Sequence, residues 1–361
     1  MIKTLIISFN YPPTIGGIET YAKELNKFFF DKKDIEFYFP SNKKSPKPFL
    51  RGISLFIFIL KAVFQTVPKK YDVIHMTSFN LWLFAYLYSK FNKDTKFIIN
   101  IWGLEFVYGN KSGILPRIYN KFFINMSVLN SSNFYYMVSS KASKKLLINS
   151  GFNPEKIRFI KLGISKNRII TENTEIDLDN KYFLFVGRII KRKGLSWFVK
   201  NILPKFPEYK LKVVGPIGDK KEFNESENIM VEYLGVVSDD ELSKLRKEAT
   251  LCIVPNIYLE NDDDFEAFCF VTIESVSGGS LVVASNYQGI PEALLDGALG
   301  YLAEPSDTVS WVKNIRSALD LTSKERKELI EKRSEILKNE LSWENLFKET
   351  YKLYSEVSLS E

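Results

Sequence analysis

Short apolar runs alternate along this chain with longer segments in which apolar residues recur every three or four positions. The runs cover residues 3–9, 35–39, 71–75, 96–101 and 134–138 in the first half and 182–186, 211–214, 231–235, 251–255 and 281–284 in the second. Such runs are typical of strands buried on both faces of a parallel sheet. The segments between them predict crossover helices, so the pattern indicates an α/β protein.

Both halves open with a strand, a glycine turn and a helix. Residues 3–9 lead to Gly16 and Gly17, and residues 182–186 lead to Gly187. This order is typical of a doubly wound unit, and 361 residues suffice for two domains. The polar stretch 166–181 is the predicted linker. We therefore predict two Rossmann-like domains, at residues 1–170 and 171–344.

Several candidate functional residues lie close together between residues 264 and 292. Glu266 and Glu274 stand eight positions apart, and the apolar spacing after Cys269 predicts a helix that ends at Gly278-Gly279. Glu266 would then lie just before the helix, with Glu274 about two turns along it. The unpaired backbone N–H groups at the helix start favour a phosphate ligand.

Two further loops carry residues suited to phosphate. Glycines at 16 and 17 let the backbone approach an anion closely. Arg188 can hold phosphate oxygens bidentately, while Lys193 adds a point charge. These loops would bind a phosphate group, although each loop alone could be an ordinary turn or a solvated basic loop.

The stretch 264–292 resembles the nucleotide-sugar site of the retaining family-4 glycosyltransferases (glycosyl transferases group 1), which have the GT-B fold. The family pattern is Glu, seven residues, Glu, a small-residue turn, a valine-rich strand and Gly-Gly-x-Pro-Glu. The matching residues are Glu266, Glu274, Gly279, Val282, Val283, Gly289, Pro291 and Glu292. Residues 12–19 and 187–194 also resemble the family's Pro-Pro-x-x-Gly-Gly-x-Glu and Gly-Arg-x-x-x-x-Lys-Gly loops.

This resemblance implies transfer of a sugar, with retention, from a nucleotide diphosphate donor to an acceptor hydroxyl. It implies that Arg188 and Lys193 stabilise the departing diphosphate, Glu266 contacts the donor sugar and Glu274 binds the ribose. The other implied donor-binding residues are Gly16, Gly17, Gly187, Gly215, Phe270 and Val271. A UDP-sugar is the expected donor and no metal cofactor is expected. The final helix, about 345–361, is expected to pack back onto the first domain.

Several positions depart from the family pattern. Ala267-Phe268-Cys269 stands where Gly-Phe-Gly is usual, and Gln288 replaces a glycine. On the acceptor side Trp102 and Glu105 stand where the family commonly has a histidine and an aspartate. A non-catalytic nucleotide-sugar-binding protein is therefore the alternative to an enzyme.

Charge is distributed unevenly. Residues 1–170 hold 26 Lys/Arg and 9 Asp/Glu, whereas the remainder holds 24 and 34. A basic first half suits anionic lipid or a polyphosphate-linked acceptor. Nucleic acid is the competing explanation, but no recognition motif supports it.

Residues 42–67 combine Lys43, Lys44, Lys47 and Arg51 with an apolar run at 53–60. This run is expected to be too short and too interrupted to span a bilayer, so it predicts either an interfacial helix or a core helix with a basic flank. We expect a peripheral protein on the inner face of the cytoplasmic membrane that acts on a lipid-linked saccharide. A soluble glycosyltransferase with a small acceptor is the alternative.

Few other residues suggest chemistry. His75, the only histidine, lies at a strand end, where a structural role competes with a catalytic one. Asp262 and Asp264 suit a hard cation but equally suit a solvated loop, and we expect no metal site. Two cysteines argue against a disulfide framework and for a reducing compartment, and the start predicts a strand rather than a signal peptide.

Overall fold

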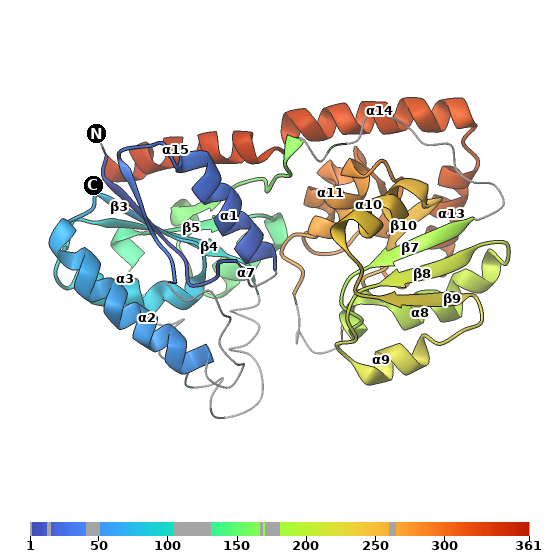
Figure 1. The fold of residues 1–361 in the computed structure, drawn as a ribbon, viewed down its shortest axis with the longest axis horizontal. Coiled ribbons are helices and arrows are strands. Elements are labelled where there is room, and N and C mark those ends of the chain that lie inside the picture. Colours follow the sequence, from blue (N-terminus) through green and yellow to red (C-terminus); the bar gives the residue numbers. More distant parts are fainter. Residues whose placement is uncertain are drawn as a thin grey trace. The chain divides into compact units, whose positions relative to one another are not determined.

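The computed structural model describes residues 2–12, 16–40, 51–103, 131–166, 181–259 and 265–360, with the single positions 114, 118 and 169. The chain forms two compact units, which we describe separately. Unit 1 contains Met1–Lys161 and Trp343–Glu361, and unit 2 contains Leu162–Ser342. Each unit is a parallel six-stranded sheet with helices (Figure 1). The predicted α/β class with two doubly wound sheets is confirmed.

In unit 1 the strand order is β2-β1-β3-β4-β5-β6. The strands are β1 (Thr4–Ile7), β2 (Ile35–Tyr38), β3 (Val73–Met76), β4 (Lys96–Ile101), β5 (Phe134–Val138) and β6 (Ile157–Phe159). The helices are α1 (Gly17–Phe29), α2 (Arg51–Thr66), α3 (Trp82–Ser89), α7 (Lys141–Asn149) and α15 (Trp343–Ser358). In β1, β3, β4 and β5 every side chain is buried, which explains their continuous apolar sequences.

Unit 2 has the strand order β12-β11-β10-β7-β8-β9. The strands are β7 (Tyr182–Val186), β8 (Lys210–Val214), β9 (Val231–Gly235), β10 (Leu251–Val254), β11 (Val282–Ser285) and β12 (Tyr301–Ala303). The helices are α8 (Leu195–Asn201), α9 (Lys220–Glu225), α10 (Asp239–Glu248), α11 (Phe270–Ser277), α12 (Ile290–Ala293), α13 (Thr308–Leu319) and α14 (Ser323–Glu340). The chain winds outward from β7 on one side and from β10 on the other. The carboxyl ends of β7 and β10 therefore flank a topological switch point, where doubly wound folds bind ligands.

The boundary between the units differs from the sequence prediction, which set it at residues 170 and 171. Unit 2 begins at Leu162 because the backbone N–H of Ile164 donates to Leu341 at 2.9 Å, and Ile164 also forms a parallel bridge with Ser342. The segment that enters unit 2 is thus paired with the segment that leaves it. Most of the predicted linker, 166–181, lies outside the described residues.

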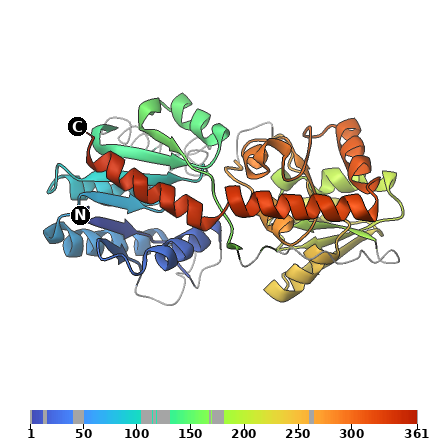
Figure 2. The same cartoon turned by 90° about the horizontal axis from the view of Figure 1, so that it is seen from above.

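The last helix, α15, belongs to unit 1 and crosses its strands (Figure 2). Trp343 starts it, and the Trp343 ring stacks on Phe347 with centroids 5.6 Å apart. The imidazole of His75, fully buried on β3, is 2.6 Å from the Tyr354 hydroxyl through Nδ1 and 2.8 Å from Asn100 Oδ1 through Nε2. Because Asn100 Oδ1 can only accept, Nε2 donates and Nδ1 accepts from Tyr354. His75 therefore ties α15 to the sheet.

The prediction that the apolar run at 53–60 is too short to span a bilayer is corrected by α2. The helical segment Arg51–Lys69 has a mean hydropathy of 1.4 and is long and apolar enough to cross a membrane by length and composition, contrary to our expectation. One of its faces nevertheless lies in the core of unit 1, where Phe58 contacts the rings of Phe9 and Tyr38. This face is therefore covered by protein, whereas most of the segment is exposed, with 17% of it buried.

Candidate active site

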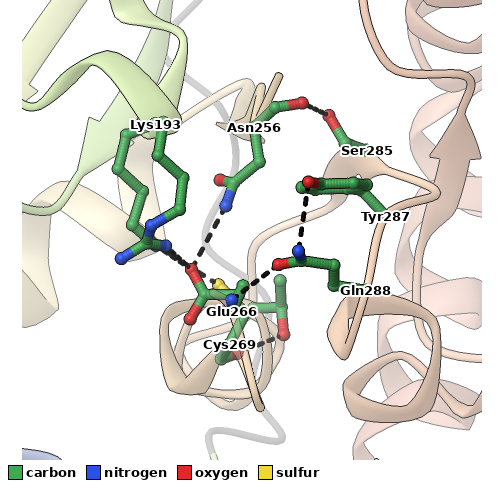
Figure 3. A network of polar contacts seen from close by, with 9 residues as sticks. Lys193, Asn256, Glu266, Cys269, Ser285, Tyr287 and Gln288 are labelled. Atoms are coloured by element: carbon green, nitrogen blue, oxygen red, sulfur yellow. Dashed lines mark hydrogen bonds and ion pairs between the residues drawn. The ribbon is translucent and has the colours of Figure 1, made fainter. Parts of the chain in front are cut away.

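The candidate site lies in unit 2 at the switch point between β7 and β10. Lys193 and Arg192 follow β7, Asn256 follows β10, and Gln288 follows β11. Glu266 precedes α11 and is in contact with all four residues (Figure 3). Because the strands are parallel, their carboxyl ends bring these distant segments to one edge of the sheet.

One oxygen of the Glu266 carboxylate receives three donors. Its Oε2 is 2.5 Å from Lys193 Nζ and 3.2 Å from Asn256 Nδ2, and it also pairs with Arg192 Nη1. Among the described residues its Oε1 has no hydrogen-bond partner. The carboxylate is thus fixed through one oxygen, which leaves the other to accept a hydrogen bond from a ligand.

Electrostatics keep Glu266 ionised. Burial alone would raise the pKa of this carboxyl, but the charges of Lys193 and Arg192 outweigh that effect and hold the pKa below its ordinary value. Arg192 and Glu266 are both buried, with exposed fractions of 5% and 9%. The site therefore presents a negative charge whose position is set by two cations.

A tight turn after β7 directs the two cations inward. Residues Lys191–Lys193 form one 3-10 turn that ends at Gly194, which has φ 65°. A Cβ at Gly194 would lie 2.0 Å from the carbonyl oxygen of Pro255, so only glycine fits there. The carbonyl of Arg192 accepts from the N–H of Ile257 at 3.0 Å. The turn is therefore locked against the chain that leaves β10.

The backbone of Glu266 is held from the opposite side by the loop after β11. Its N–H donates to Gln288 Oε1 at 2.6 Å, and its carbonyl accepts from the N–H of Gly289 at 2.9 Å. A Cβ at Gly289 would lie 2.0 Å from the carbonyl oxygen of Ala267, which explains the glycine. Protein contacts therefore position both the side chain and the backbone of Glu266.

Comparison with known proteins identifies the chemistry of this unit. Residues 166–335 match the family Glycosyl transferases group 1. An uncharacterized glycosyltransferase of Methanocaldococcus jannaschii is 25% identical over 98% of each chain. The lipopolysaccharide 1,2-N-acetylglucosaminetransferase of Salmonella typhimurium is 32% identical over 49% of each chain. The chain is a glycosyltransferase with a group 1 domain.

Solved structures show the same architecture. The Anabaena protein HepE, solved with UDP and glucose, superposes with a TM-score of 0.72 at 16% identity and covers 98% of this chain and 100% of its own. Sucrose-phosphate synthase from Thermosynechococcus elongatus gives 0.73 at 19% identity over 98% of each chain. The glycosyltransferase thus has the GT-B fold, as its sequence predicts.

Arg188 lies outside the Glu266 network of the glycosyltransferase. It is exposed at the carboxyl end of β7, whereas Lys193 is turned toward Glu266. Nearby, Gly215 has no room for a side chain because a Cβ there would lie 2.1 Å from the carbonyl oxygen of Gly187. A Cβ at Gly187 itself would meet nothing within 4 Å. Open space therefore lies beside this pair of glycines.

The structure places the remaining predicted unit 2 residues on α11. Phe270 and Val271 begin that helix after Cys269. Glu274 Oε2 lies 2.6 Å from Arg246 Nη2, which sequence reasoning did not foresee. Cys269 is a buried thiol whose pKa is raised by burial to about 11, so it is neutral at physiological pH, with Sγ 4.0 Å from Lys193 Nζ.

Unit 1 carries the other predicted residues. Gly16 and Gly17 stand at the start of α1, and a Cβ at Gly16 would lie 2.4 Å from Glu19 Oε2. The indole N–H of Trp102 donates to the Thr77 carbonyl at 2.8 Å, so only its ring is left for a ligand. Glu105, Asp262 and Asp264 lie outside the described residues. Within the part of the chain that is described, no group of three or more His, Cys, Asp or Glu could hold a metal ion.

Sequence reasoning missed Arg192, Asn256 and Gln288. Arg192 sits between two other basic residues, and nothing in that run distinguishes the buried one. Asn256 is fully buried, but its segment reads only as the end of a strand. Gln288 did give a signal, because it stands where the family pattern has glycine.

Proposed function

We propose that this glycosyltransferase moves a hexosyl or N-acetylhexosaminyl group, with retention, from a nucleoside diphosphate sugar to a hydroxyl of a lipid-linked or surface-polysaccharide acceptor. The observation that carries the proposal is the Glu266 carboxylate, fixed through Oε2 by Lys193, Arg192 and Asn256, with Oε1 left to a ligand. Such a group stabilises positive charge as it develops on a sugar ring.

The donor side of the proposal rests on the edge of the sheet beside Glu266. Arg188 is exposed at the end of β7, the space over Gly187 is open, and α11 begins next to Glu266. Guanidinium groups and helix N-termini both bind phosphate. A solved relative of the same fold was captured with UDP and glucose, which makes a UDP-sugar the first donor to test. In this proposal side chains and backbone N–H groups, rather than a metal, offset the diphosphate charge.

Glu266 acts electrostatically in this scheme. The bond from the anomeric carbon to the diphosphate oxygen breaks, the diphosphate leaves with the electron pair, and the acceptor oxygen forms the new bond to the same carbon. The acceptor hydroxyl proton passes to the departing diphosphate, which balances the step. Two cations already share the negative charge of Oε2, which weakens Glu266 as a nucleophile. We therefore assign it the support of the cationic sugar rather than a covalent bond.

Donor binding can be tested with an exposed pair of basic residues. We expect UDP and its best-binding sugar to raise the melting temperature, and Arg188→Ala to weaken that binding about 10- to 100-fold, as for the loss of a charged hydrogen bond. The control is Lys191→Ala, an exposed cation in the same loop. Binding would be measured by calorimetry. Equal loss in both variants would contradict a specific phosphate contact, and no binding of any nucleoside diphosphate by the parent would refute the proposal.

The acceptor side of the proposal rests on α2. Its outward face exposes Ile53, Phe56, Ile57, Leu60 and Phe64, the last 85% exposed. Arg51 and Lys61 are exposed on the same helix, and α2 contains no acidic residue. An apolar stripe between cations fits the surface of an anionic bilayer, where apolar side chains enter the headgroup region. We therefore propose a peripheral location on the inner face of the cytoplasmic membrane.

A cavity beside this stripe suits an acyl or isoprenoid chain. Its volume is about 260 Å³ and its lining is mostly apolar. The lining residues are Gly52, Leu55, Phe56, Ile59, Phe79, Asn80 and Leu83. Phe56 belongs both to this lining and to the exposed face of α2, so a lipid tail could reach the cavity from the bilayer surface. The Salmonella relative acts on lipopolysaccharide by name, which supports a lipid-linked acceptor.

The membrane proposal predicts a loss of vesicle binding. We expect Ile57→Asp with Phe64→Asp to lower partition onto vesicles of phosphatidylglycerol and phosphatidylethanolamine at least tenfold, because two exposed apolar side chains lose their burial in lipid. Flotation would measure it. Ile229→Asp is the control, since Ile229 is fully exposed in unit 2. Unchanged flotation of the double variant would instead favour a soluble enzyme with a small acceptor.

A further inference from the structure

Gln288 adopts a backbone conformation that favours glycine. Its φ is 50°, in the left-handed region, where residues with a side chain are uncommon and strained. A glycine here would remove the strain, and the resemblance noted above has glycine at this position. The contacts of the Gln288 side chain therefore offset this strain.

Both ends of the Gln288 amide are used. Oε1 accepts from the N–H of Glu266 at 2.6 Å, and Nε2 donates to the hydroxyl of Tyr287 at 3.0 Å. Figure 3 shows Gln288 between these two residues. The amide is thus a bridge that links the position of Glu266 to that of the Tyr287 ring.

Tyr287 is one half of an aromatic pair. Its ring meets Tyr258 edge to face, with centroids 4.9 Å apart and planes at 82°. Tyr258 follows β10 and Tyr287 follows β11, so neighbouring strand ends supply them. Tyr258 is 59% exposed, and a single edge-to-face neighbour covers at most one face of its ring, which leaves the other face open to a ligand.

We propose that Tyr258 and Tyr287 form a binding surface for a pyranose ring and that Gln288 fixes the position of this surface relative to Glu266. The inference deepens the proposed function and rests on it. One face of a pyranose presents C–H groups, which pack against the electron-rich face of an aromatic ring, while the tyrosine hydroxyls remain able to bond sugar hydroxyls. A sugar held there would be connected through Gln288 to the carboxylate that supports the reaction.

The bound pyranose has two possible sources, the transferred sugar of the donor or the terminal sugar of the acceptor. Two probes separate them. The first is the best stabiliser among UDP-glucose, UDP-galactose, UDP-N-acetylglucosamine and GDP-mannose, compared with its own nucleoside diphosphate. The second is maltose, observed by saturation-transfer NMR with that nucleoside diphosphate bound.

The decisive variant is Tyr258→Leu, because the side chain is exposed and its removal leaves the core intact. If the donor sugar lies on the ring, affinity for the nucleotide sugar falls about three- to tenfold while affinity for the nucleoside diphosphate is unchanged. If the acceptor lies there, maltose binding is lost and nucleotide-sugar affinity is unchanged. Tyr258→Phe, which keeps the ring, is the matched control and retains both. No change in either probe would overturn the proposal.

Gln288→Gly tests the bridge. Because the strain is removed, the melting temperature of this variant is expected to be equal or higher. The variant is nevertheless expected to lose binding of the same sugar probe, nucleotide sugar or maltose, that Tyr258→Leu loses. Retained sugar binding would refute the role of Gln288. The proposed function fails separately, when the parent binds no nucleoside diphosphate. If the parent binds it and Arg188→Ala weakens that binding while Tyr258→Leu alters neither probe, only the aromatic surface is refuted.

Discussion

Glu266→Gln is expected to lower kcat for sugar transfer about 10²- to 10³-fold and to leave nucleoside diphosphate affinity within about threefold. The amide keeps the size of the side chain but removes the negative charge that faces the sugar. Initial rates with the best donor and calorimetry with its diphosphate would measure the two effects. Glu225→Gln, which breaks an exposed ion pair with Lys200, should change neither. A Glu266→Gln enzyme with the parental kcat would contradict the assigned role.

Loss of the fold must be separated from loss of the chemistry in this variant. Glu266→Gln leaves Arg192 and Lys193 with no carboxylate partner in a buried site, which is expected to destabilise unit 2 by several kcal/mol. The double variant Glu266→Gln, Arg192→Met removes one of the unpaired charges. It should regain part of the lost melting temperature and remain inactive. Recovery of activity together with stability would show that Glu266 serves only the fold.

Acidification is expected to destabilise unit 1 through His75. Burial lowers the pKa of His75 to about 4, although its hydrogen bond to Asn100 opposes the shift. The unfolded chain has the ordinary value of about 6.5, so it binds the proton first as the pH falls. The contribution of His75 to the free energy of unfolding is therefore fully present above about pH 6.5. It is lost progressively down to about pH 4, by about 3 kcal/mol in total.

A His75→Gln variant isolates this effect from the carboxylates that also titrate. Glutamine can donate to Asn100 and accept from Tyr354, but it does not ionise. Urea unfolding at pH 7 and pH 4.5 should show a smaller loss of stability for the variant than for the parent. Equal losses in the two proteins would mean that His75 is not the titrating group.

The sheets could be predicted because buried parallel strands leave continuous apolar runs. The expected strands at 96–101 and 134–138 coincide with β4 and β5. The boundary between the units could not be predicted, since it depends on pairing between Ile164 and Ser342, far apart in the sequence. Local composition marks a polar linker at 166–181, but it does not show that Ile164, just before this linker, is paired with Ser342.

The types of residue in the candidate site could be predicted from the sequence better than the contacts between them. Glu266 and Lys193 follow from motifs, and the structure joins them. Arg192 could not be identified, because the direction of its side chain depends on one 3-10 turn and on a carboxylate 74 positions away. The pairing of Glu274 with Arg246 likewise depends on how α10 and α11 pack. Motifs identify the chemistry, whereas tertiary structure selects the partners.

The return of α15 to unit 1 has a consequence for biosynthesis. The ribosome makes the sheet of unit 1 before unit 2, but Tyr354 and Phe347, which cover His75 and α1, are made after unit 2. The N-terminal half must therefore wait, with apolar surface uncovered, while all of unit 2 is translated. Unit 2 is continuous and can fold in the interval, so the half that starts first is completed second.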